Sequence, residues 1–244
     1  MLATSAMPLP TAASFHTTRW SRVVLARDPS TEGKEALQQL CAAYYAPVTA
    51  FLRREGRHDD EARELAHDFF ATVLAGASIA QAEQSRGRFR SYLLGAVKHF
   101  LSHRRKAATR LRRGGGDTPL SMDAEDAPMV ADATQLSPDA AFDREWALTV
   151  LSRAMEALRT EQTAEGKADA FERLQPWLSG EAAHGDQAAL AESLGMNVNA
   201  LKAATHRLRQ RFRLLVRAEI ASTLEDESMV DEEMQALFTA LRRR

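Results

Sequence analysis

The sequence predicts an all-α protein with two small helical domains joined by an acidic, flexible linker. Apolar residues recur at three- and four-residue spacing, and no segment sustains an alternation of apolar and polar residues, so helices are favoured over strands. A stretch rich in Gly, Pro and Asp begins at residue 114 and interrupts this helical pattern. The length of 244 residues is sufficient for two domains.

The first domain is expected at 15–113, after a disordered N-terminal segment at 1–14. Its periodic segments predict helices over 20–27, 31–45, 59–75 and 88–112, with a further helix that begins at Pro47 and ends at Gly56. Thr31 is the predicted N-cap of the second of these helices.

The linker is expected at 114–139 and the second domain at 140–224, with helices over 140–160 and 167–178, followed by a helix, a break and a long helix at 187–224. Gly195 can end the shorter helix because glycine accepts a positive φ, and Asn197 can cap the longer one. An acidic tail at 225–244, which is either regulatory or a solubilising end, completes the chain.

Charge is divided unevenly along the chain. Residues 84–116 hold 10 basic and no acidic residues, 198–218 hold 6 basic and no acidic residues, and 117–145 hold 8 acidic residues and 1 basic residue. This pattern indicates contact with a polyanion at two places. The alternative is self-neutralisation, in which each basic block folds onto an acidic one.

The C-terminal basic block coincides with a predicted helix-turn-helix. The helix after Asn197 has an apolar seam and, beside it, a polar and cationic stripe, which fits a recognition helix in the major groove. Residues near its start would face base edges and the later arginines phosphates. An amphipathic surface helix, or one that packs on a partner protein, is the alternative. The candidate DNA-binding residues are Asn199, Ala200, Lys202, Ala203, His206, Arg207, Arg209 and Arg213.

The N-terminal basic block interleaves cations with aromatic residues, a combination that suits single-stranded nucleic acid. Phe89 and Phe100 lie on the apolar stripe and are expected in the core, whereas Tyr92 is a candidate for stacking on a base. The candidate residues are Arg86, Arg88, Arg90, Tyr92, Lys98, Arg104 and Arg105.

An acidic face precedes this block on the helix at 59–75. Acids in a first turn favour the positive end of the helix dipole, but Glu64 and Asp68 lie beyond that turn and indicate a basic protein partner. The candidate partner-binding residues are Asp60, Glu61, Glu64 and Asp68.

Catalytic and metal sites are not predicted. His99 and His103 have helical spacing for a metal but no third ligand nearby, and no nucleophile–base set has a familiar spacing. We therefore expect a non-enzyme without cofactor or metal. The single cysteine, Cys41, suits a reducing compartment, and no apolar run is long enough for a membrane span, so a cytoplasmic protein is expected.

Taken together, these motifs resemble the extracytoplasmic-function sigma factors. Residues 61–70 (EARELAHDFF) are similar to the family's segment that binds the β′ clamp helices of RNA polymerase. Residues 89–93 (FRSYL), with Arg104 and Arg105, are similar to the segment that melts and reads the −10 element. Residues 194–202 (LGMNVNALK) are similar to the helix that reads the −35 element. The resemblance implies a sigma factor that binds core RNA polymerase, including its β flap, and recognises promoter DNA as duplex and melted strand. A helix-turn-helix regulator that acts without polymerase is the alternative, and an interaction adaptor is a further rival.

Residues 15–20 (FHTTRW) and 217–220 (RAEI) resemble a subgroup of this family that is often associated with serine/threonine kinases. Arg63 stands where the family has an acid, so the face that binds the clamp is less negative than usual. The resemblance to this subgroup implies that a phosphothreonine in this helix supplies the missing charge, and Thr72, the only hydroxyl between 59 and 77, is the residue to which the resemblance points. A kinase or an anti-sigma factor is the implied regulatory partner. The acidic linker is interpreted as a mimic of nascent RNA or as a solvated spacer.

Overall fold

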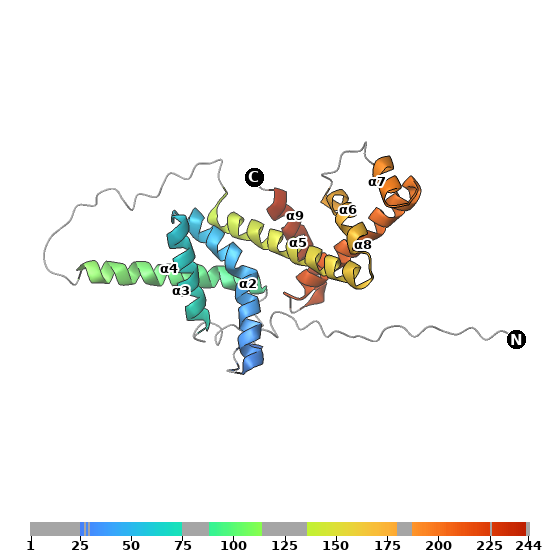
Figure 1. Ribbon diagram of the computed structural model, residues 1–244. Coiled ribbons are helices and arrows are strands. Elements are labelled where there is room, and N and C mark those ends of the chain that lie inside the picture. Colours follow the sequence, from blue (N-terminus) through green and yellow to red (C-terminus); the bar gives the residue numbers. More distant parts are fainter. Residues whose placement is uncertain are drawn as a thin grey trace.

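The computed structural model describes residues 25, 26, 28, 30–74, 88–113, 136–179, 187–224 and 226–242, and every regular element in these ranges is a helix (Figure 1). The all-α prediction is therefore confirmed for this part of the chain. None of the described helices is long and apolar enough to cross a membrane. The elements are α2 (Thr31–Arg54), α3 (Asp59–Leu74), α4 (Phe89–Arg113), α5 (Pro138–Ala164), α6 (Ala168–Ser179), α7 (Gln187–Ser193), α8 (Val198–Ala221), the 3₁₀ turn η3 (Glu227–Met229) and α9 (Val230–Arg242).

The long helix α2 is continuous where the sequence predicts two helices. Its N-cap is Ser30, whose hydroxyl accepts a hydrogen bond from the Gly33 amide at 3.1 Å, so the prediction of Thr31 as the cap is wrong. The predicted break before Pro47 is also wrong, because Pro47 lies buried inside the helix. A proline in a helix interior costs about 3 kcal/mol. Burial of the residues around it, including Tyr44 and Val48, offsets that cost, and α2 bends in Figure 1.

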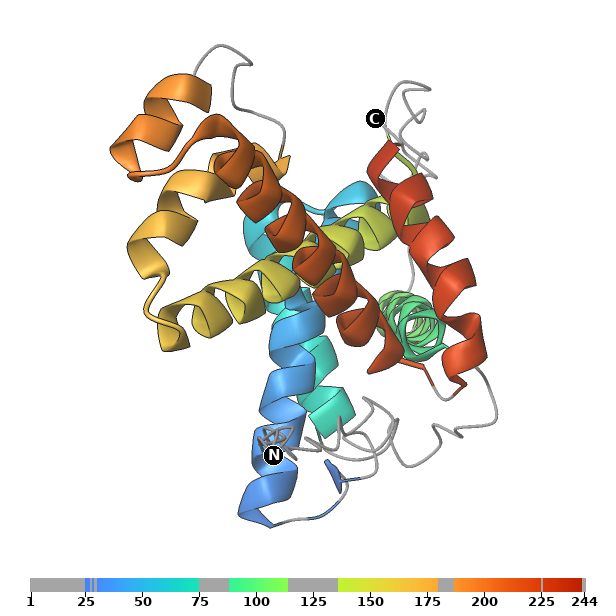
Figure 2. The ribbon, with the colours of Figure 1, turned by 90° about the vertical axis from the view of Figure 1, so that its right-hand side faces the viewer.

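One large core joins the N-terminal helices to α5, α8 and α9. The helix α5 lies at its centre and packs against α2, α8 and α9 (Figures 1 and 2). Trp146 of α5 and Tyr44 of α2 are fully buried there, together with Ile220 of α8 and Leu237 of α9. The two-domain division remains a prediction, because described residues of both expected domains share this core.

A smaller core holds the helix-turn-helix. It is built from the end of α5, from α6 and α7, and from the first half of α8, and its buried members are Leu158, Phe171, Leu174, Ala191, Leu201 and Leu208. The helix α7 has only 7 residues, so this packing, rather than its intrinsic helix propensity, stabilises it. The predicted apolar seam of the long C-terminal helix is thus the side that α8 buries.

The last described segment is a helix, α9, with one side in the large core. Its buried residues are Val230, Glu233, Met234, Leu237 and Ala240. The acidic tail expected at 225–244 therefore contains an amphipathic helix packed on the rest of the protein. Most of the expected linker, 114–135, lies outside the described residues, and α5 begins at Pro138 with Ser137 as its N-cap.

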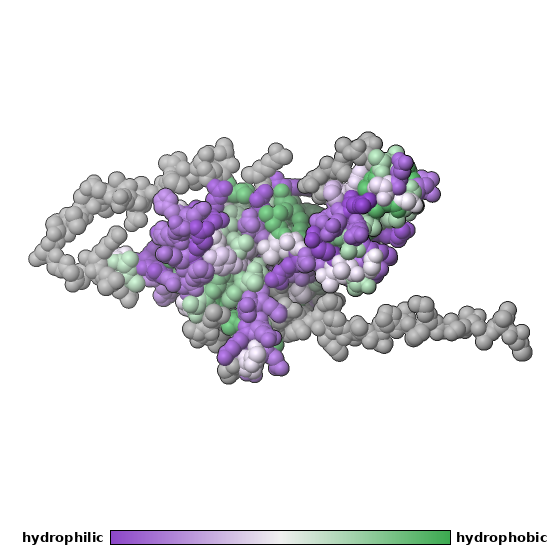
Figure 3. All heavy atoms as spheres, viewed as in Figure 1, coloured by the Kyte–Doolittle hydropathy of each residue, from purple (hydrophilic) through white to green (hydrophobic). Residues whose placement is uncertain are grey.

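Figure 3 shows hydrophilic side chains over much of the described surface, and a hydrophobic area over α9 and the adjoining part of α5. Phe238 of α9 is 52% exposed and Leu148 of α5 is 38% exposed. The helix α9 therefore presents apolar side chains to solvent as well as to the core.

Candidate nucleic-acid interface

The turn between α7 and α8 contains a glycine at positive φ and an asparagine that caps the second helix. Gly195 has a φ of 64°, a left-handed conformation that strains any residue with a Cβ. Asn197 then caps α8, because its side-chain oxygen accepts a hydrogen bond from the Ala200 amide at 2.8 Å. Both local predictions are confirmed. They fix the direction of α8 relative to α7 and the small core.

All the α8 residues predicted to contact DNA are exposed: Asn199, Ala200, Lys202, Ala203, His206, Arg207, Arg209 and Arg213. Two other arginines of α8 form ion pairs: Arg211 binds Glu161 at 2.5 Å, and Arg217 binds Asp231. Within the described ranges, no carboxylate forms an ion pair with Lys202, Arg207 or Arg213. The exposed start of α8 therefore carries cationic groups that a phosphate can reach without displacing a described acid.

A groove of about 340 Å³ runs along this stripe, lined by residues of α6, α7 and α8 that include Trp177, Lys202, His206 and Arg209. The Arg209 guanidinium donates a hydrogen bond to the Trp177 carbonyl oxygen at 2.6 Å. This contact ties α8 to the end of α6. Arg209 is thus partly engaged by backbone, while Lys202 and His206 line the groove with exposed side chains.

The described cations predicted for the single-strand surface lie on or next to α4, and each has an acidic partner. Arg86 lies outside the described residues. Tyr92 is half-buried, with its ring stacked near Phe89 at a centroid separation of 6.1 Å. Three of the ion pairs involve cations that are about half exposed, and these pairs are worth about 0–1 kcal/mol each. These are Lys98 with Asp139 (2.7 Å), Arg104 with Asp68, and Arg105 with Glu55 (2.8 Å).

The other two cations, Arg88 and Arg90, form a buried ion network with α9. Glu233 is 1% exposed, and its carboxylate lies 2.5 Å from Arg90 Nε and 3.1 Å from Arg88 Nε. Arg90 also pairs with Asp143 of α5 and lies over the Trp146 ring at 4.6 Å. Burial alone would lower the pKa of Arg90, but the hydrogen bond and charge of Glu233, together with Asp143, raise that pKa above its ordinary value.

The acidic face of α3 is exposed but partly paired. Asp60 binds Arg63 at 2.5 Å, Glu61 binds Arg57 at 2.8 Å, and Asp68 pairs with Arg104. Glu64 is exposed. The pKa of Arg63 is raised mainly because Asp60 accepts its hydrogen bond. Arg63 therefore neutralises Asp60, its own neighbour on the same face.

Thr72, the predicted phosphorylation site, lies on the exposed side of α3. Its hydroxyl donates a hydrogen bond to the Asp68 carbonyl oxygen at 2.8 Å, one turn earlier in the helix. This intrahelical bond leaves the side chain at the surface. A modifying enzyme could therefore reach the oxygen after a rotation of the side chain.

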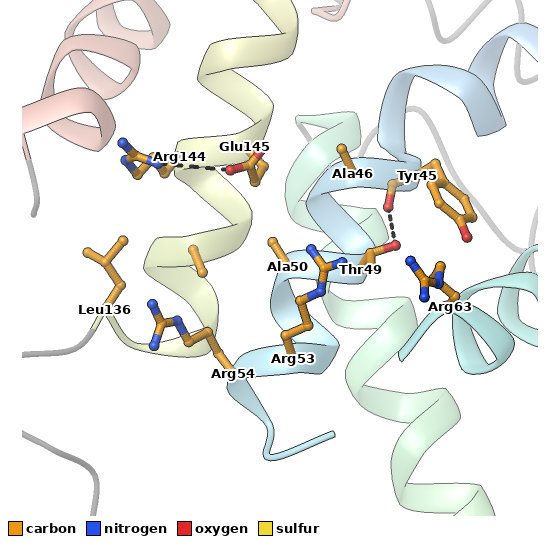
Figure 4. A pocket seen from close by; sticks show the side chains of 11 residues that line it. Tyr45, Ala46, Thr49, Ala50, Arg53, Arg54, Arg63, Leu136, Arg144 and Glu145 are labelled. Atoms are coloured by element: carbon orange, nitrogen blue, oxygen red, sulfur yellow. Dashed lines mark hydrogen bonds and ion pairs between the residues drawn. The ribbon is translucent and has the colours of Figure 1, made fainter. Parts of the chain in front are cut away.

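A second cavity, of about 530 Å³, lies where α2, α3 and the start of α5 meet (Figure 4). Four arginines line it, Arg53, Arg54, Arg63 and Arg144, with Glu145 as the acidic member. The charge is reduced by acids of α3, since Arg53 binds Asp59 at 2.8 Å and Arg63 binds Asp60. The lining offers hydrogen-bond donors to an anion and contains no pair of carboxylates for acid–base chemistry.

The two histidines of α4 contact each other, and the single cysteine is partly buried. His99 Nε2 and His103 Nε2 lie 3.2 Å apart on α4, and within the described ranges no cluster of three metal-ligating side chains occurs. Burial raises the pKa of the Cys41 thiol to about 11, so this thiol is almost fully protonated at neutral pH.

Three residues outside the predicted set complete the network around Arg90: Glu233, Asp143 and Trp146. The sequence holds no signal for this grouping beyond the acidic character of the segments around 143 and 233, because the partners come from α4, α5 and α9. No protein-family model, no curated protein and no solved structure matches this chain.

Proposed function

We propose that this protein is a sigma factor that binds core RNA polymerase and directs promoter-specific initiation. The observation that carries the proposal is the exposed polar and cationic start of α8, which follows a short helix, a glycine at positive φ and an asparagine cap. This arrangement suits the major groove, with Asn199 and Lys202 toward the bases and Arg213 toward a phosphate.

Two further surfaces support polymerase-dependent rather than simple duplex binding. The α3 face with Glu64 and Asp68 offers carboxylates to a basic partner, as the resemblance to the clamp-binding segment implies. The α4 surface, with Lys98, Arg104 and Arg105, offers cations for an unpaired strand, because each cation is about half exposed and its acidic partner can be exchanged for a phosphate at low cost. The proposal assigns polymerase to the first surface and the −10 element to the second.

The decisive experiment is run-off transcription with the purified protein, bacterial core RNA polymerase and a genomic promoter library. We expect co-elution of the protein with core enzyme and transcripts that start downstream of shared −10 and −35 motifs. The charge reversal Glu64→Lys should weaken co-elution, whereas Glu156→Lys on α5 should not. A protein that binds no core enzyme, with or without phosphorylated threonines, contradicts the proposal.

Substitutions on α8 test the −35 surface separately. Lys202→Ala and Arg213→Ala each remove a cation that has no described acidic partner, so each should weaken duplex binding. A lost phosphate contact lowers the slope of log K against log salt by about 1. Lys167→Ala is the matched control, because it removes an exposed cation that already binds Glu165 at 2.7 Å in another part of the chain. Equal salt slopes for all four proteins would contradict the assignment.

Phosphorylation of Thr72 is part of the proposal, because a phosphate would add about −1.5 to −2 charge to the α3 face beside Asp68. Thr72→Glu should then raise promoter output in cells above that of Thr72→Ala. Equal output from the two variants would remove Thr72 from the proposal and leave the polymerase contact itself unaffected.

A second function, a helix-turn-helix regulator that acts without polymerase, is favoured by one observation. Arg88, Arg90, Lys98, Arg104 and Arg105, the described cations predicted for the single-strand surface, each have an acidic partner, whereas Lys202, Arg207 and Arg213 have none among the described acids. Such a regulator would bind duplex operators with the same salt dependence in the presence and absence of core enzyme. The transcription experiment separates the two functions.

A further inference from the structure

The acidic start of α9 lies against the start of α4, although the two segments are far apart in the sequence. Figure 2 shows α9 beside α4, which is seen nearly end-on. The first turn of α9 contains three successive acids, Asp231, Glu232 and Glu233. All three bind arginines: Glu232 and Glu233 pair with residues at the start of α4, and Asp231 pairs with Arg217 of α8.

The carboxylates of α9 cover the guanidinium groups of Arg88 and Arg90. Glu232 lies 2.5 Å from Arg88, and the two oxygens of Glu233 lie 2.5 and 3.2 Å from Arg90 nitrogens. This forked arrangement is the one that guanidinium groups also form with phosphate oxygens. A phosphate and the Glu233 carboxylate therefore cannot occupy this side of Arg90 together.

Burial makes this contact different from the other ion pairs of α4. Arg90 is 11% and Arg88 22% exposed, whereas Lys98, Arg104 and Arg105 are each about half exposed. Phosphate in solution can approach the exposed pairs directly. Arg90 becomes accessible only when Glu233, which is 1% exposed, moves away with its helix.

We propose that α9 is a built-in competitor for nucleic acid: its acidic first turn occupies the guanidinium groups of Arg88 and Arg90, and it must be displaced before they bind the backbone of an unpaired strand. The inference rests on the proposed function in one respect, namely that the start of α4 contacts single-stranded DNA. The regulated step is an exchange of the Glu232 and Glu233 carboxylates for phosphates.

The same helix connects the two predicted DNA surfaces. Asp231 binds Arg217 near the end of α8, and Val230 and Leu237 of α9 lie in the core that also contains Ile220 of α8. Displacement of α9 therefore breaks contacts with α8 as well as with α4. Displacement of α9 would thus uncover Arg88 and Arg90 and, at the same time, break the ion pair between Asp231 and Arg217 of α8.

The test uses the full-length protein and a fluorescein-labelled single-stranded oligonucleotide of mixed sequence. The variant is Asp231→Asn with Glu232→Gln, which removes two charges from side chains that are 78% and 65% exposed, so the core is untouched. The control is Glu156→Gln with Glu165→Gln, which removes two charges from exposed side chains of the α5 region. Fluorescence anisotropy gives the affinities, and hydrogen exchange of residues 230–242 in the unsubstituted protein reports the displacement of α9.

We expect the α9 variant to bind the strand roughly three- to tenfold more tightly than the unsubstituted protein, and the control to change affinity by less than about twofold. Oligonucleotide should also speed exchange in 230–242. Equal affinities of the two variants, with 230–242 still protected when DNA is bound, would overturn the competitor role while leaving DNA binding by the protein intact. Absence of binding by every protein would overturn both the single-strand surface and the role of α9.

Discussion

Substitution of Glu233 by glutamine should destabilise the protein strongly, because this carboxylate is buried between two arginines. The change keeps the shape of the side chain and one acceptor oxygen but removes the charge that balances Arg88 and Arg90. Removal of one partner from a fully buried ion pair costs about 3–5 kcal/mol. Asp143 and Glu232 remain to balance the two arginines, so we expect a loss of about 2–3 kcal/mol in the free energy of unfolding.

Urea unfolding followed by circular dichroism measures this loss, and thermal unfolding provides a second reading. For a chain of this length, 1 kcal/mol corresponds to about 2–4 °C, so the Tm should fall by about 4–12 °C. Asp231→Asn is the matched control, because its pair with Arg217 is exposed on both sides and contributes at most about 1 kcal/mol.

Equal stabilities of the two variants, within about 0.5 kcal/mol, would contradict the burial of the Glu233 carboxylate in solution. That result would mean that α9 does not stay packed in solution, since only its packing excludes water from Glu233. A large loss in both variants would refute the prediction differently, because an exposed pair cannot contribute as much as a buried one.

Three further predictions concern single residues. Gly195→Ala should lower the free energy of unfolding in urea by about 1–2 kcal/mol, because the φ of this residue is 64°. Gly95→Ala, inside α4 with no atom within 4 Å of the added Cβ, should raise it by about 0.5–1 kcal/mol. Changes of the same sign in the two variants would contradict this prediction. Cys41 should react with a thiol reagent at pH 8 about 100-fold more slowly in the folded than in the guanidinium-unfolded protein, because burial raises the pKa of its thiol to about 11; equal rates would show that the site opens. The pKa of Glu161 is lowered mainly by hydrogen bonds from Arg211, so the pair adds stability above the unfolded pKa of about 4.3, and this stability is lost as pH falls through the lower folded pKa. Arg211→Gln should therefore reduce the loss of stability in acid, by less than about 1 kcal/mol, and an unchanged curve of stability against pH would contradict the pairing.

Local sequence signals were sufficient for the helical class, for α3 to α8 and for the turn between α7 and α8, but not for the continuity of α2 or for α9. The three- and four-residue spacing of apolar side chains depends only on helix geometry, and the roles of Gly195 and Asn197 depend on their own φ and side-chain length. The errors at Thr31 and Pro47 arose where a rival local choice was close in energy. Ser30 is an equally good cap one residue earlier, and tertiary burial outweighed the loss of a hydrogen bond at Pro47.

The pairing of charges could not be predicted in the same way. Arg90 and Glu233 are 143 positions apart, and nothing local to either residue specifies the other. Their contact requires α9 to place its apolar side on the core that α5 organises, which is a property of the whole chain. The sequence left open two uses for the basic blocks, polyanion binding and self-neutralisation. The structure pairs Lys98, Arg104 and Arg105 of α4 with acids, and it gives Lys202, Arg207 and Arg213 of α8 no described acidic partner.

This division implies an order of events for any strand that binds α4. Exchange of a carboxylate for a phosphate changes the energy little at Lys98, Arg104 and Arg105, since these three cations are about half exposed and their pairs contribute about 0–1 kcal/mol each. At Arg90 the exchange also requires a buried helix face to leave the core, which costs several kcal/mol. A strand would therefore engage the far part of α4 first and reach Arg90 last. The energy for that last step has to come from a further contact, and polymerase bound to the acidic face of α3 is the partner that the proposed function supplies.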